Sequence, residues 1–217
     1  MKQLFIIGFV GLAGIVSCSP DSTVAVVNPV VTVKPAPDES VNRLHEQFHG
    51  KYRVISSVSI EPLDINFDGV ASLDMVQELA ELQTNDRTKY CVELRIYGPT
   101  QKDPKTYFSF MQWWPEQSIR LGNKYWDNNE LIAYDPKYVV NYDFQGASRS
   151  FSFSTDLKQI TVNPNDNEKS FRWGRPESVT IDDNGRLRVV NKRRLYSKAG
   201  VKDVVITTVY ERFTMTT

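Results

Sequence analysis

The sequence is poor in the residues that most often carry chemistry. Its 217 residues include two cysteines and two histidines, and 26 acidic side chains balance 26 basic ones. A chain without net charge lacks the positive field that favours nucleic acid or an anionic membrane surface. Both histidines fall in one short stretch, so no Ser-His-Asp arrangement can be assembled, and no glycine-rich phosphate loop occurs. We therefore predict no nucleic-acid partner and assign no catalytic residue.

Long apolar runs are scarce, and the clearest one lies at the N-terminus. Lys2 precedes an apolar run over residues 4–16, which is too short for a comfortable membrane span and is typical of an export signal. The run ends in Ile15-Val16-Ser17-Cys18, which resembles the lipobox of bacterial lipoproteins. That resemblance implies removal of residues 1–17 and anchoring of Cys18 by more than one acyl chain. An ordinary secretory signal with an incidental cysteine is the alternative.

The segment after Cys18 is rich in proline, which blocks regular helix and disfavours central strands. Its prolines are Pro20, Pro29, Pro35 and Pro37. We predict that residues 18–40 form an extended tether, which holds a folded domain of residues 41–217 off a bacterial outer membrane. If Cys18 carries lipid, Cys91 has no partner for a disulfide.

The pattern of residues 41–217 is mainly that of β-strands. A short helix is expected from Ser40, a plausible N-cap, to His49, before Gly50. Alternating apolar residues then recur at near-regular spacing, and the turn Asp182-Asp183-Asn184-Gly185 is a strong hairpin signal. One helix, capped by Ser72, is expected after the first strand. We predict an antiparallel up-and-down barrel of about eight to ten strands, with a sandwich as the alternative.

The residues at two places in this pattern resemble the sequence motifs of lipocalin-like barrels, which are found in many bacterial lipoproteins. Gly50-Lys51-Tyr52 opens the first strand where lipocalins have Gly-x-Trp, and Arg212 lies in the last strand. In lipocalins the late arginine packs on the tryptophan ring and closes one end of the barrel. The resemblance covers residues 41–217 and implies a cavity for a small hydrophobic ligand.

An acidic loop has the ligand spacing of the first half of an EF-hand. Alternate oxygens of Asp64, Asn66 and Asp68, with Gly69 for the tight turn, are arranged as calcium requires. The other candidate ligands are the Val70 carbonyl, Ser72 and Asp74. The twelfth position is Met75 rather than a bidentate glutamate. We predict a structural calcium site, and the alternative is an Asx-turn that leads into a capped helix without an ion.

The stretch His45-Glu46-Gln47-Phe48-His49 matches H-E-x-x-H, the signature of zincin metallopeptidases. On a helix, His45 and His49 share a face and can bind Zn²⁺, with Glu46 as general base. Gly50 ends the helix immediately, and a proline-rich tether precedes it where zincins have a sheet. We favour a helix with Phe48 packed inward and keep a zinc hydrolase as the alternative.

Trp113 and Trp114 are adjacent in a predicted strand and must point to opposite faces. One is expected in the core, and the other is a candidate to line a cavity mouth or to stack on a sugar, although packing of the surrounding aromatic group in the core is the favoured interpretation. Together these features predict a non-enzymatic, membrane-anchored binding or interaction module for a small hydrophobic ligand, a glycan or a protein. A glycan-binding lipoprotein is the second alternative. A barrel filled by side chains would favour protein interaction over ligand carriage.

Overall fold

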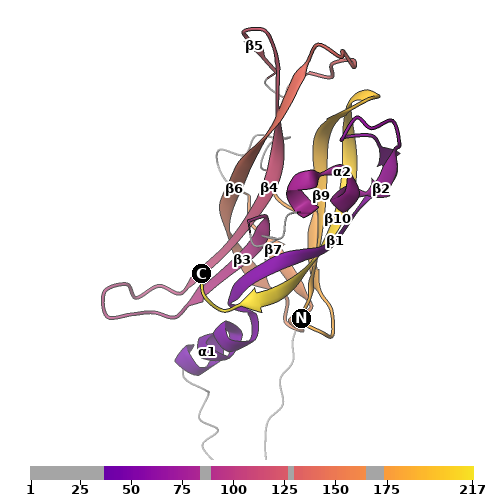
Figure 1. The fold of residues 1–217 in the computed structure, drawn as a ribbon. Helices are drawn as coiled ribbons and strands as arrows, with labels where there is room; N and C mark the ends of the chain where they lie inside the picture. The colour runs from indigo at the N-terminus through magenta and orange to yellow at the C-terminus, as the bar shows by residue number, and fades with distance from the viewer. Residues whose placement is uncertain (1–36, 84–88, 127–129, 165–173) are drawn as a thin grey trace, which may run out of the picture. The chain divides into compact units, whose positions relative to one another are not determined.

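The computed structural model describes residues 37–83, 89–126, 130–164 and 174–217 (Figure 1). The chain divides into residues 1–34 and a second unit, Pro35–Thr217, which contains every described residue. The predicted signal segment 1–17, the predicted lipidation site Cys18 and the predicted tether as far as residue 36 lie outside the described residues. Within them, no helix has the length and apolarity needed to cross a membrane.

The second unit is a closed, antiparallel, eight-stranded β-barrel, which confirms the predicted fold class. Each strand pairs with the next along the chain, and the last pairs back to the first, with Tyr52 opposite Arg212. The barrel strands are β1 (Gly50–Leu63), β3 (Cys91–Tyr97), β4 (Tyr107–Leu121), β6 (Val139–Phe153), β7 (Gln159–Val162), β8 (Ser178–Ile181), β9 (Leu187–Ser197) and β10 (Gly200–Thr214). Two short strands extend this set: β2 (Ser72–Asp74) pairs with β1, and β5 (Lys124–Tyr125) pairs with β4.

The strands form because their side chains alternate between the barrel interior and solvent. In β9, for example, Leu187, Val189 and Asn191 are buried, whereas Arg188 and Lys192 are exposed. Most inward apolar residues of the strands form one main core, and Ile119, Trp126, Tyr196 and Val201 form a second, smaller cluster. Helix α1 (Pro37–Phe48) lies at one end of the barrel and adds Val41 and Phe48 to that core (Figure 1).

The helical insertion after β1 differs from the prediction in two ways. Ser72 is not the N-cap, because it belongs to β2, and Asp74 caps the helix by accepting a hydrogen bond from Val76 N. The insertion is also two short helices, α2 (Met75–Glu78) and α3 (Ala80–Gln83), rather than one. Leu79 between them has an extended backbone, with φ −112° and ψ 98°, and its side chain is fully buried. The free energy gained by burying the Leu79 side chain outweighs the free energy that a continuous helix would gain.

One predicted boundary is also wrong. Helix α1 begins at Pro37 rather than Ser40, since a proline in the first turn loses no helical hydrogen bond. Strand β4 continues through Pro115, because β3 pairs with β4 only up to Gln112 and the strand beyond has an edge where proline is tolerated. Residues 131–134 are irregular chain.

The middle of the barrel interior is occupied by polar side chains. Gln112 Nε2 donates to Asn191 Oδ1 at 2.9 Å and to the Tyr210 hydroxyl at 3.0 Å, and Asn191 Nδ2 donates back to Gln112 Oε1 at 3.1 Å. These contacts cross the barrel from β4 to β9 and β10. Deeper along β4, Glu116 pairs with Arg193 at 2.8 Å, and both side chains are buried. The lumen is thus filled at this level.

Candidate functional site

The α1 end of the barrel is closed by Tyr52 and Arg212. The Tyr52 hydroxyl donates to the Phe48 carbonyl at 2.8 Å, and burial raises the pKa of Tyr52 to about 12. Arg212 Nη1 donates to the carbonyls of Glu46 and Gln47, both at 2.9 Å, where the last helical carbonyls need donors. Both residues therefore fasten α1 over the barrel end.

The histidine motif lies at the same end. The rings of His45 and His49 stack with centroids 4.1 Å apart, and Glu46 is exposed. His49 Nδ1 accepts a hydrogen bond from Ile96 N at 3.0 Å, and Nε2 lies 3.3 Å from Thr217 Oγ1. Burial, with a smaller effect of His45, lowers the pKa of His49. The observed role of His49 is to join α1 to β3 and to the C-terminus.

The acidic loop folds as a series of side-chain-to-backbone turns. Asn66 Oδ1 accepts from Asp68 N at 3.0 Å, and Asp68 Oδ1 accepts from Val70 N at 2.7 Å. Asp64 Oδ2 accepts from Gly69 N at 3.0 Å. This is the Asx-turn arrangement, in which the backbone N–H groups occupy the carboxylate and amide oxygens.

Two observations bear on calcium at this loop. Asp64 Oδ1 is buried without a hydrogen-bond partner, and the Lys198 ammonium lies 3.8 Å from Asp64 Oδ2 and 3.5 Å from the Phe67 carbonyl. Lys198 thus already supplies a positive charge beside the predicted ligands. Asp74 Oδ1 caps α2 by accepting from Val76 N, and Ser72 Oγ accepts from Asp74 N at 3.0 Å. Across the described ranges, no three His, Cys, Asp or Glu side chains gather as a metal site. Calcium binding stays a prediction.

The two tryptophans point to opposite faces of β4, as predicted. Trp114 is only 2% exposed, and the Arg193 guanidinium lies 4.2 Å from its ring centroid. Trp113 is half-buried on the outer face, where it stacks on Phe144 with centroids 4.4 Å apart and planes 7° apart. Gly146 makes room for this ring, because a Cβ there would lie 2.3 Å from it. Trp114 belongs to the filled interior, and a sugar-stacking role for Trp113 stays a prediction.

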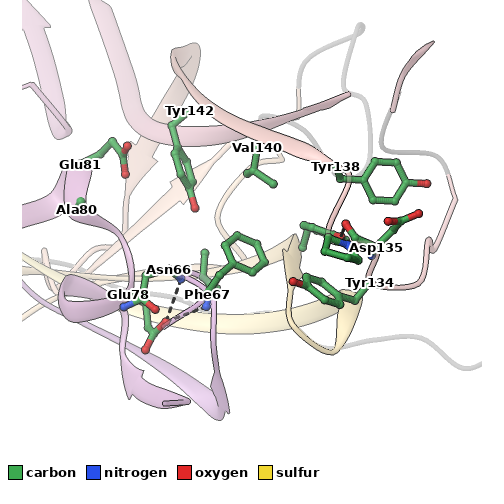
Figure 2. Close-up of a pocket in the computed structure, with 13 residues that line it drawn as sticks. Asn66, Phe67, Glu78, Ala80, Glu81, Tyr134, Asp135, Tyr138, Val140 and Tyr142 are labelled. Carbon is green, nitrogen blue, oxygen red and sulfur yellow. Dashed lines mark hydrogen bonds between the residues drawn. The ribbon is translucent and has the colours of Figure 1, made fainter. Parts of the chain in front are cut away.

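A pocket that the sequence did not predict lies beside the helical insertion. Its volume is about 450 Å³, within the usual range for small-molecule sites. The lining comes from the acidic loop, from α2 and α3, from the chain that enters β6, and from the end of β9 (Figure 2). Its 13 lining residues include five aromatic rings and three carboxylates, and none of the 13 is basic.

One side of the pocket is aromatic. Phe67 and Tyr134 stack with centroids 6.0 Å apart, and Tyr196 lies 5.8 Å from both Phe67 and Tyr138. The Tyr196 hydroxyl accepts from Asp135 N at 2.9 Å and donates to the Asp135 carbonyl at 3.1 Å, which holds the segment before β6. These rings support one another through edge and face contacts and form a preorganised surface.

The opposite side is acidic. Figure 2 shows Glu78 and Glu81 on the helical insertion, across the pocket from Tyr134 and Tyr138. Glu78 is 3% exposed, and its Oε2 accepts hydrogen bonds from Ile65 N at 2.8 Å and Asn66 N at 3.4 Å. Its other oxygen accepts none from any residue that the structure describes. The carboxylate is thus held in place with one oxygen uncommitted.

Two further lining residues affect the polarity and the shape of the pocket. Burial raises the pKa of Tyr142 to about 12, with smaller contributions from Glu81 and Glu78, so its hydroxyl stays neutral at physiological pH. Phe67 has a left-handed backbone, φ 63°, which is unfavourable for a bulky residue. Strain of this kind concentrates at binding sites, and here it directs the Phe67 ring into the pocket (Figure 2).

The sequence comparisons add no family to this description. The chain matches no protein-family model, and neither the curated proteins nor the solved structures contain a significant match.

Proposed function

We propose that the protein is a non-enzymatic, lipid-anchored binding module of the bacterial cell envelope, and that its ligand binds in the pocket between the helical insertion and the start of β6. The observation that carries this proposal is the pocket itself, which is about 450 Å³ in volume and combines a preorganised aromatic side with fixed carboxylates. Ligand sites are commonly concave, largely apolar and supplied with a few convergent polar groups.

The location of the binding site departs from what the lipocalin resemblance implies. A lipocalin-like carrier holds its ligand in the lumen, but here Gln112, Asn191 and Tyr210 bond across the lumen, and Glu116 and Arg193 pair within it. The positions of Tyr52 and Arg212 at the closed end still support a lipocalin-like architecture. We place the ligand at the side pocket because these bonded side chains occupy the lumen at that level, although Arg193 Nε and Trp114 Nε1 are buried there without a hydrogen-bond partner.

Membrane attachment rests on the lipobox-like residues that end in Cys18. Acylation at Cys18 predicts incorporation of labelled palmitate and recovery of the chain with bacterial membranes. A Cys18→Ala variant should lose the label and move to the soluble fraction, whereas Cys91→Ala, at the buried second cysteine, should keep both properties. Palmitate incorporation that persists in Cys18→Ala would contradict the anchor.

The pocket assignment is tested by fragment binding. A set of small aromatic compounds is added to the full-length chain in non-ionic detergent, and binding is located by nuclear magnetic resonance (NMR) chemical-shift changes. Shifts should concentrate on the pocket residues and should disappear in Tyr134→Ala. Tyr125→Ala is the matched control, because Tyr125 is 69% exposed on β5 and does not line the pocket. Shifts confined to lumen residues, or unaffected by Tyr134→Ala, would place the site elsewhere.

A further inference from the structure

We propose that the pocket takes a small organic cation, with its ammonium group facing the carboxylates of the helical insertion and its apolar body against the aromatic side. This inference rests on the proposed function and names the class of ligand. It depends on three observations, which concern the charge of the pocket, the absence of a basic partner for Glu78 among the described residues, and the nature of the opposite side.

The first observation is that charge of only one sign lines the pocket. Glu78, Glu81 and Asp135 contribute carboxylates, and none of the lining residues is Lys, Arg or His. Carboxylates that share a partly enclosed site repel one another and disfavour an anionic ligand. An ammonium ion relieves that repulsion, so the empty pocket is electrostatically complementary to a cation.

The second observation sets Glu78 apart from the other buried carboxylates. Among the described residues, four carboxylates are at least nine-tenths buried: Asp64, Glu78, Glu93 and Glu116. Three of them have a basic partner within 4 Å, namely Lys198, Arg95 and Arg193. Glu78 has none, and two backbone N–H groups hold only its Oε2. Because a buried charge is costly without a partner, the missing cation is expected to be the ligand's.

The third observation is the composition of the opposite side. The faces of Phe67, Tyr134 and Tyr138 offer negative electrostatic potential as well as apolar area. Figure 2 shows the rings of Tyr134 and Tyr138 across the pocket from Glu78 and Glu81, with the Phe67 ring between the two sides. A metal ion would leave this aromatic surface unused, whereas an amine with an apolar body contacts both sides. The strained backbone of Phe67 is consistent with selection for its ring at this place.

The experiment compares two probes of similar shape and different charge. Phenethylammonium and the neutral 2-phenylethanol are titrated into the full-length chain in non-ionic detergent at pH 7, and NMR shifts of pocket residues report affinity and location. We expect phenethylammonium to bind about tenfold more tightly than 2-phenylethanol. Nα-acetyl-lysine methylamide, which keeps its side-chain ammonium, is a third probe. Tighter binding of this probe than of phenethylammonium indicates a peptide lysine as the ligand, and weaker binding indicates a free amine.

Variants that each remove one carboxylate charge test which residues bind the cation. Glu78→Gln keeps an oxygen acceptor for Ile65 N and Asn66 N but removes the charge, and it should lower affinity for phenethylammonium at least to that for 2-phenylethanol. Glu81→Gln should lower amine affinity as well, and it carries the test if Glu78→Gln fails to fold. Asp143→Asn is the control, because it removes the same charge next to Tyr142 from an exposed residue that does not line the pocket. Asp143→Asn should bind as the unaltered chain does.

The outcomes separate this inference from the function it rests on. Equal affinity for phenethylammonium and 2-phenylethanol, with shifts at pocket residues, would overturn the cation and leave the pocket as a binding site. If neither these probes nor the aromatic fragments shift the resonances of pocket residues, both the cation inference and the proposed binding function are overturned. Equal losses in Glu78→Gln and Asp143→Asn would show a long-range field rather than a site, and would also overturn the inference.

Discussion

The barrel lumen and the side pocket both contain polar and aromatic side chains, but their polar groups differ in their hydrogen-bond and charge partners. In the lumen, Gln112 and Asn191 exchange hydrogen bonds, and Glu116 meets Arg193 at 2.8 Å. In the pocket, Glu78 is held by the backbone and has no basic partner among the residues that the structure describes. The lumen bonds join facing strands and stabilise the fold, although Arg193 Nε and Trp114 Nε1 stay unbonded, whereas Glu78 lines a cavity that a ligand can enter. The lumen is therefore structural, and the pocket is the better candidate for function.

The largest effect should follow from breaking the lumen ion pair. Burial lowers the pKa of Arg193, and Glu116 opposes that effect, so each ion depends on the other. Arg193→Met leaves the Glu116 charge buried and unpaired, which should cost about 3–5 kcal/mol in the free energy of unfolding measured with urea. The double variant Arg193→Met/Glu116→Leu should recover most of that loss. A single variant as stable as the parent would show that the lumen pair is not structural.

A matched pair of changes compares the two regions directly. Glu116→Gln strands the Arg193 charge in the lumen and should cost about 3 kcal/mol of unfolding free energy. Glu78→Gln retains its hydrogen bonds and strands no cation, so it should change stability by less than about 1 kcal/mol. Thermal and urea unfolding of the two variants measure these changes in stability. Equal destabilisation would mean that Glu78 has a structural role like that of Glu116.

A smaller effect is expected from pH at the closed end of the barrel. The pKa of His49 is lowered in the folded state, so the unfolded chain binds its proton first as pH falls. Stability from neutral His49 is therefore complete above the ordinary value of 6.5 and declines as pH drops below it towards the lowered pKa. The melting temperature should fall between pH 7.5 and 5.5, and His49→Asn should reduce that slope. An unchanged slope in His49→Asn would assign the pH dependence to other groups.

The smallest effect concerns calcium at the acidic loop, where Lys198 lies beside Asp64. If the loop binds calcium, the ion competes with the ammonium group of Lys198. Lys198→Met should therefore increase stabilisation by 10 mM calcium to about 1 kcal/mol, measured as a shift in melting. Adding Asp64→Asn should abolish the shift. No calcium effect in either the parent or Lys198→Met would leave the loop as an Asx-turn alone.

The barrel could be predicted because strand alternation and hairpin turns are local signals. Residues such as Tyr138, Val140 and Tyr142 reveal a strand face through a spacing of two, whatever lies opposite. The break at Leu79 could not be predicted in this way, because helical spacing continued across it and tertiary burial decided the backbone.

The pocket was missed for a similar reason. Phe67 and Glu78 belong to one insertion, but Tyr134 and Tyr196 are distant from it in the sequence, and the barrel brings them beside that insertion. A weak signal was present in Glu78 and Glu81, which are acidic and three residues apart on the inserted helical segment. No sequence pattern showed that Glu78 would be buried without a cation. The predicted calcium ligands, in contrast, were local in sequence, and the structure shows most of them bonded to the backbone of their own loop.

The most direct test of the account is the affinity of phenethylammonium for the unaltered chain and for Glu78→Gln, measured by isothermal titration beside Asp143→Asn. We predict that Glu78→Gln weakens amine binding about tenfold while its unfolding free energy stays close to that of the parent, and that Asp143→Asn changes neither. Unchanged amine affinity in a folded Glu78→Gln chain would contradict the claim that Glu78 is the unpaired partner of a cationic ligand.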